Sequence, residues 1–126
     1  MSHWTAIDLQ IKSIPALRAA CQELGCHLTE GNTATGYSGM STQVDMNITI
    51  PETRYTIGVK RNSDGTFKMV ADFYNRKLRA TVGENGNLLK QRYAICAAEQ
   101  AARRKGYTVT RQNLNDGKIK LKVGVR

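Results

Sequence analysis

The sequence predicts one α+β domain over residues 1–126, with an antiparallel β-sheet of about five to six strands and two helices packed on one face. Three observations predict this class. Two segments carry apolar residues at helical spacing, several short segments alternate apolar and polar residues, and turn signals rich in Gly, Asn and Asp lie between them. The 126 residues are the usual size of one domain, and 40% hydrophobic residues indicate a chain that buries a core.

The first helix is predicted over 14–24. Ser13 is a suitable N-cap, Pro15 fits the first turn, where its missing N–H is harmless, and Gly25 is the expected end. The apolar face of this helix consists of Ile14, Leu17, Cys21 and Leu24.

The second helix is predicted over 88–105, with Asn87 as its cap and Gly106 after its end. One stripe of this helix consists of Leu89, Tyr93, Cys96 and Gln100. The adjoining stripe is rich in alanine, and we expect such small side chains to let the helix lie close to the sheet; it consists of Ala94, Ala97, Ala98 and Ala101.

The strands are predicted from alternation over 26–30, 44–50, 55–61, 66–73, 107–111 and 118–123. Two hairpins follow from turn residues: Asn62 to Gly65 joins the third segment to the fourth, and Asn115-Asp116-Gly117 joins the last two. The segments 31–43 and 74–87 are predicted to be loops, because they are rich in glycine and polar residues.

The charge is positive and uneven. The net charge is +9, from 19 Lys and Arg against 10 Asp and Glu; residues 1–50 carry −2 and residues 51–126 carry +11. This asymmetry favours an anionic partner for the C-terminal part, either nucleic acid, an acidic protein or an anionic membrane surface. Solubility alone is the alternative explanation of a basic chain.

The candidate anion-binding residues are basic side chains from three segments. Alternate residues of the last strand lie about 6.5–7 Å apart, close to the phosphate repeat of an extended single strand. The full set is Lys118, Lys120, Lys122, Arg103, Arg104, Lys105, Arg111, Arg76, Lys77 and Arg79. Tyr37, Tyr74 and Tyr107 are candidates for stacking on bases. The alternative is that the lysines only solvate the outer face of the sheet and protect an edge strand.

Metal-binding and catalytic patterns are weak. Cys21, Cys26, His27 and Cys96 lack the paired spacing of a structural zinc site, and His3 is a candidate copper ligand only if Met1 is retained. We expect no metal and no cofactor. No phosphate-binding glycine motif, catalytic triad or carboxylate pair is present, so the sequence predicts no catalytic residues and no enzyme.

The predicted compartment is the cytoplasm, or the plastid stroma if an organelle encodes the chain. No apolar run of some 18 residues is long enough to span a membrane, and the first residues do not read as a secretory signal. Three cysteines, an odd number, fit a reducing compartment.

An ordered set of motifs carries a family resemblance. In chain order these motifs are Met1-Ser2-His3-Trp4, Ile7 and Ile11, Leu24-Gly25, Ile57-Gly58 before Asn62…Asp64-Gly65, Val70-Ala71-Asp72-Phe73, Gln91-Arg92-Tyr93-Ala94, Lys105-Gly106-Tyr107 and Asp116-Gly117-Lys118-Ile119. Together they resemble the hypothetical chloroplast reading-frame thirty-five family, a family of unknown function in cyanobacteria and red-algal plastids with relatives in other bacteria and phages. The chain departs from it at Trp4, where members usually have Phe, and at Tyr74, near which they usually have a second aromatic residue, often Trp. The resemblance implies one domain and supplies no catalytic residues.

Taken together, the sequence predicts a small, basic, non-enzymatic binding module. Its expected partner is nucleic acid, with RNA favoured, bound through a basic face in the C-terminal part. The alternative is a protein-interaction adaptor, or an accessory subunit of a larger complex, that recognises an acidic protein.

Overall fold

The computed structural model describes residues 4–125, and His3 lies outside them. The fold is α+β, as predicted, and its centre is a five-stranded antiparallel sheet in the order β1-β7-β6-β5-β2. These strands are β1 (Trp4–Ile11), β2 (His27–Glu30), β5 (Met46–Thr49), β6 (Thr56–Arg61) and β7 (Phe67–Asp72). The helices are α1 (Ile14–Glu23), α2 (Arg76–Val82) and α3 (Asn87–Arg104). Two separate hairpins are formed by β3 (Thr33–Thr35) with β4 (Ser41–Gln43) and by β8 (Thr108–Asn113) with β9 (Ile119–Gly124).

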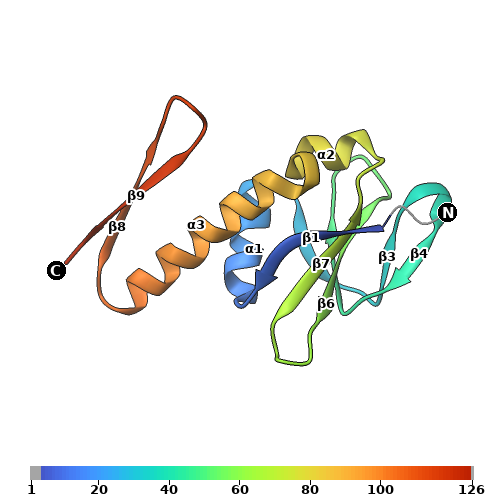
Figure 1. The fold of residues 1–126 in the computed structure, drawn as a ribbon, viewed down its shortest axis with the longest axis horizontal. Helices are drawn as coiled ribbons and strands as arrows, with labels where there is room; N and C mark the ends of the chain where they lie inside the picture. Colours follow the sequence, from blue (N-terminus) through green and yellow to red (C-terminus); the bar gives the residue numbers. More distant parts are fainter. Residues whose placement is uncertain (1–3, 126) are drawn as a thin grey trace.

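The core lies between the sheet and the helices, and α1 and α3 pack side by side over one face of the sheet (Figure 1). Helix α1 begins as predicted, because the Ser13 side chain accepts a hydrogen bond from the Ala16 backbone N–H at 3.2 Å. Leu17 and Leu89 from the helices, and Ile57 from the sheet, are fully buried in this core.

Strand β1 is an element that the sequence analysis missed. It pairs antiparallel with β7 at the edge of the sheet, with a change of register between Ile7 and Ile11. Both isoleucines are buried and Leu9 is partly buried, whereas Asp8 and Gln10 are exposed. The alternation that defines a half-buried strand is therefore present in this segment.

The prediction that 31–43 is a loop is wrong. The segment forms β3, a short 3₁₀ helix (Tyr37–Gly39) and β4, and this hairpin packs on the face of the sheet opposite the helices (Figure 1). The side-chain amide of Asn47 donates to the Thr33 carbonyl at 2.7 Å, and Thr56 Oγ1 accepts from the Thr35 N–H at 3.0 Å. Close packing explains two of the glycines in this segment. An added Cβ would lie 2.6 Å from Asn47 Nδ2 at Gly31 and 3.0 Å from Asp72 Oδ2 at Gly36.

The prediction that 74–87 is a loop is wrong as well, because 76–82 form α2. The Asn75 side chain caps this helix by accepting from the Leu78 N–H at 2.9 Å. Leu78 and Val82, four residues apart, bury the same side of the helix in the core. A second 3₁₀ helix (Glu84–Gly86) then leads into α3, which begins at Asn87 with Gly86 as its N-cap, where Asn87 was expected.

The second predicted hairpin exists, but it does not join the main sheet. Strands β8 and β9 form a sheet of their own beside α3, at the end of the molecule away from β3 and β4 (Figure 1). Leu121 is only partly buried on this hairpin and does not belong to the core cluster. Likewise Ala94, Ala98 and Ala101 of α3 are exposed to solvent, so most of the alanine stripe does not face the sheet.

Candidate nucleic-acid interface

The hairpin β8–β9 has two chemically different faces. Residues paired across the hairpin share a face, so the register assigns every side chain to one side. The inner face, which we define by its position toward α3, consists of Val109, Arg111, Asn113, Ile119, Leu121 and Val123. The outer face consists of Thr108, Thr110, Gln112, Lys118, Lys120 and Lys122.

Arg111 anchors the inner face to both helices. Its Nε and Nη2 donate to the two carboxylate oxygens of Glu99 in α3, each at 2.7 Å. Its Nη1 and Nη2 donate to Glu23 at the end of α1, at 2.6 Å and 2.8 Å. Cys96 also donates from its thiol to Glu23 Oε2 at 3.2 Å, and Arg92 pairs with Glu23 Oε1 at 3.2 Å. We call Arg111, Glu23 and Glu99 the anchor cluster.

The anchor cluster perturbs the groups within it. Hydrogen bonding to Arg111 lowers the pKa of Glu23 from 4.5 to about 2, and the same guanidinium lowers the pKa of Glu99. The two carboxylates in turn raise the pKa of Arg111. Burial, together with the hydrogen bond to Glu23, raises the pKa of Cys96 to about 11. The cluster is therefore fully ionised at neutral pH, and Cys96 stays a neutral thiol.

The outer face carries positive charge toward solvent. Lys118, Lys120 and Lys122 are all exposed. Lys118 lies 3.9 Å from Asp116 in the turn, and both of these side chains are more than half exposed, so this contact holds the ammonium group only weakly. The turn itself is tied to α3, because Gln91 Nε2 donates to the Gly117 carbonyl at 3.0 Å. The lysines thus stand on a hairpin fixed at its tip and along its inner face.

The end of α3 adds three more cations near the start of the hairpin. Arg103, Arg104 and Lys105 are exposed, and the chain passes from them directly into β8. Arg103 also borders a hollow of about 460 Å³ beside Val109 and Arg111. The structure therefore brings the α3 cations and the hairpin lysines to the same end of the molecule.

Helix α2 holds the remaining predicted residues elsewhere. It precedes α3, whose 18 residues correspond to a length of about 27 Å, so Arg76, Lys77 and Arg79 lie far from the cations at the other end of α3. Lys77 pairs with Glu52 at 2.8 Å, and Arg79 Nη1 donates to two backbone carbonyls that precede the helix. These residues therefore do not join the cations at the end of α3.

The three tyrosines proposed to stack on bases also lie in two separate places. Tyr37 and Tyr74 form an edge-to-face pair with ring centroids 4.8 Å apart, and they are 40% and 62% exposed. They lie near Asp72, whose carboxylate accepts from the backbone N–H groups of both residues. Tyr107, between α3 and β8, is partly buried and is the one nearest to the basic hairpin.

The cysteines are core residues. Cys21, Cys26 and Cys96 are buried and free, and the Cys26 thiol donates to the Cys21 carbonyl at 3.4 Å. His27 is exposed on β2. Within residues 4–125, no group of three His, Cys, Asp or Glu side chains is placed to hold a metal ion.

Sequence reasoning missed Glu23 and Glu99 altogether. No local pattern connects them to Arg111, because Glu23 lies 88 residues before it in the chain. Thr110 and Gln112 were also missed, although the alternation of the hairpin places them opposite Lys122 and Lys120.

The sequence also matches a known protein family. A family model described as "Protein of unknown function (DUF1257)" matches residues 20–122, from α1 to β9. The chain belongs to this family. The matched region contains every residue of the anchor cluster and all three lysines of the outer face. No curated protein and no solved structure matches the chain. Among residues 4–125, the structure contains no helix long and apolar enough to cross a membrane.

Proposed function

We propose that this DUF1257 protein is a non-enzymatic binding module that engages nucleic acid, with RNA favoured, through the outer face of the β8–β9 hairpin. One observation carries the proposal. Lys118, Lys120 and Lys122 stand in a row on a face whose other members are Thr and Gln, and that face points to solvent. Cations attract the phosphates, while hydroxyl and amide groups can bond to phosphate, sugar or base.

The basic residues differ in their contacts with the rest of the protein, and this difference supports the proposal. Arg111 is engaged by two carboxylates, so its role is to position the hairpin, although it was among the candidate anion-binding residues. Three lysines have no such structural task, and Arg103, Arg104 and Lys105 extend the positive charge beyond the hairpin. We therefore propose these six residues as the phosphate contacts, with Arg76, Lys77 and Arg79 as a separate, secondary basic patch.

A protein adaptor is the second candidate, and a different surface favours it. Tyr37, Met40 and Tyr74 are exposed near the β3–β4 hairpin, with Arg76 following on α2. Tyrosine, methionine and arginine are enriched in protein interfaces. Under this second proposal, the chain is an accessory subunit that docks on an acidic partner protein.

The family and compartment belong to the same proposal. We propose that the family is the hypothetical chloroplast reading-frame thirty-five family and that the protein works in the cytoplasm, or in the plastid stroma if an organelle encodes it. The motifs quoted above and the three reduced cysteines support this assignment.

The test is a titration of the wild-type protein and the Lys118→Gln, Lys120→Gln, Lys122→Gln triple variant against single- and double-stranded RNA and DNA at two salt concentrations. If nucleic acid is the partner, the triple variant binds more weakly, and each lost phosphate contact reduces the log–log salt slope by about 0.7–0.9 units. Wild-type protein that binds none of the four above the non-specific level, or an unchanged slope, rejects this function. A pull-down whose partner survives nuclease treatment then favours the adaptor.

A further inference from the structure

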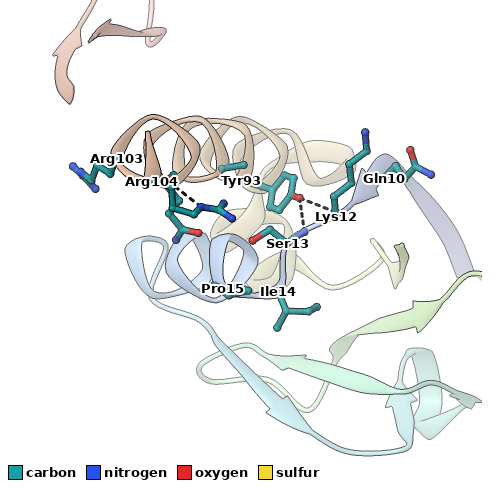
Figure 2. Close-up of a pocket in the computed structure, with 10 residues that line it drawn as sticks. Gln10, Lys12, Ser13, Ile14, Pro15, Tyr93, Arg103 and Arg104 are labelled. Atoms are coloured by element: carbon teal, nitrogen blue, oxygen red, sulfur yellow. Dashed lines mark hydrogen bonds between the residues drawn. The ribbon is translucent and has the colours of Figure 1, made fainter. Parts of the chain in front are cut away.

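A cleft of about 950 Å³ lies between α1 and α3, next to the proposed interface. One wall comes from the end of β1 and the first turn of α1, and the other comes from α3 between Tyr93 and Arg104 (Figure 2). A volume of this size is in the usual range of small-molecule sites.

The walls of the cleft are rigid where they meet. Tyr93 Oη accepts hydrogen bonds from the backbone N–H groups of Lys12 and Ser13, at 2.8 Å and 3.1 Å (Figure 2). This side chain is only 6% exposed, so it fixes the junction between β1 and α1 against α3. The cleft therefore lies at the edge of the core, between elements that are fixed to one another, and does not depend on a mobile loop.

The lining combines an apolar surface with positive charge. Ile14, Pro15 and Ala97 supply apolar walls, and Lys12, Arg103 and Arg104 supply three cations. No acidic residue lines the cleft within the described part of the chain. Arg104 lies between the two helices on the side of Tyr93, whereas Arg103 points away (Figure 2). The charge of this cleft is complementary to an anion with a flat apolar part.

The cleft also borders the cations at the end of α3. Arg103 and Arg104, two of the proposed phosphate contacts, line it. Gln100 and Arg103 also border the hollow beside Val109 and Arg111, on the inner side of the hairpin. A strand bound past the end of α3 therefore lies beside the cleft.

We infer that the α1–α3 cleft receives one unstacked nucleotide of a bound single strand, with its base against Ile14, Pro15 and Ala97 and its phosphate against Lys12 and Arg104. This inference rests on the proposed function and deepens it, because it makes the partner single-stranded. A base in a duplex is stacked and paired and cannot enter the cleft.

The experiment fills the cleft without changing its charge. Ala97→Leu adds bulk to the cleft wall, and Ala98→Leu, at an exposed position of the same helix, is the matched control. Each protein is titrated by fluorescence anisotropy against a short single-stranded RNA and an RNA duplex of the same sequence. We expect Ala97→Leu to weaken single-strand binding, because the added side chain occupies the space proposed for the base. Duplex binding and the salt slope stay as in the wild type, and Ala98→Leu matches the wild type throughout.

A second pair of variants serves if Ala97→Leu does not fold. Pro15→Glu places a carboxylate in the cleft, at an exposed position in the first turn of α1 where an acidic residue is tolerated, and Gln22→Glu makes an equal charge change at the exposed far end of α1. Pro15→Glu is expected to weaken single-strand binding more than Gln22→Glu does. If the wild type binds RNA but each cleft variant matches its control, the cleft inference is overturned and the proposed function stands. If the wild type binds no nucleic acid, the proposed function fails and the cleft inference fails with it.

Discussion

Arg111 and Glu23 are joined by two hydrogen bonds of 2.6 Å and 2.8 Å, although one residue lies in the last hairpin and the other at the end of the first helix. The same guanidinium also makes two bonds to Glu99. One side chain thus connects β8, α1 and α3. The position of the proposed binding face depends on a residue that does not belong to it.

Replacement of Arg111 by Met is therefore expected to destabilise the protein and to release the hairpin. Glu99 is only 6% exposed and would keep its charge without its main partner, so we expect a loss of about 2 kcal/mol in the free energy of unfolding. Urea unfolding measures this loss, and hydrogen exchange of the β8 and β9 amides measures the release. Lys105→Met, at an exposed position, is the control and should change stability by less than about 0.5 kcal/mol. Equal stability of the two variants would contradict the anchoring role.

The anchor cluster also predicts a pH dependence. Arg111 lowers the pKa of Glu23 from 4.5 to about 2 in the folded protein, so between these values the unfolded chain binds more protons than the folded chain. This contribution to stability is complete above pH 4.5 and is lost as the pH falls toward 2. Urea midpoints across this range measure it, with Glu23→Gln as the comparison. If the variant has the same acid dependence as the wild type, Glu23 is not the group responsible.

The outer-face lysines should matter little for folding. They are exposed, and the contact of Lys118 with Asp116 spans 3.9 Å between two solvated side chains. We expect the triple change to Gln at 118, 120 and 122 to leave the free energy of unfolding within about 1 kcal/mol of the wild type. Thermal or urea unfolding checks this. A larger loss would mean that the lysines support the hairpin, and any change in nucleic-acid binding would then need another explanation.

Substitutions in the core should separate the main domain from the hairpin. Leu17 and Leu89 are fully buried, so Leu17→Ala and Leu89→Ala should each cost about 2–5 kcal/mol. Leu121 is only partly buried and lies outside the core cluster, so Leu121→Ala should cost about 1 kcal/mol. Urea unfolding of the three variants tests this order. A Leu121 cost equal to the others would show that the hairpin shares the core.

The cysteines should behave as buried apolar residues. Cys21, Cys26 and Cys96 are buried, and the pKa of Cys96 is raised to about 11, so their thiols should react slowly with an aromatic disulfide reagent until the protein is unfolded. We also expect no stoichiometric zinc in the folded protein and no effect of chelators on its stability. One zinc ion per chain, released on unfolding, would overturn this expectation.

Local patterns account for the parts of the fold that the sequence predicts. The hairpin of β6 and β7 was predicted because its alternation and its Asn62 to Gly65 turn lie within one short stretch, and the Ser13 cap marks the start of α1 in the same way. Strand β1 carries the same alternation and could have been found from Ile7, Leu9 and Ile11.

The remaining features depend on contacts between distant segments. The small residues of 31–43 read as a loop because their partners, Asn47 and Thr56, lie on other strands. The proposed lysine row could be predicted from alternation alone, whereas its anchor could not. Glu23 and Glu99 look like ordinary helical surface residues until the hairpin folds against them.

The sequence separation of Glu23 and Arg111 also predicts the order in which parts of the molecule fold. A contact across 88 residues closes a loop of most of the chain, and its entropy cost is met only after α1 and α3 have packed together. We therefore expect the contact between Arg111 and Glu23 to form late, and the hairpin amides to exchange through openings smaller than global unfolding. We expect the interactions of Arg111 to be absent from the folding transition state. Loss of Arg111 should therefore raise the unfolding rate and leave the folding rate nearly unchanged.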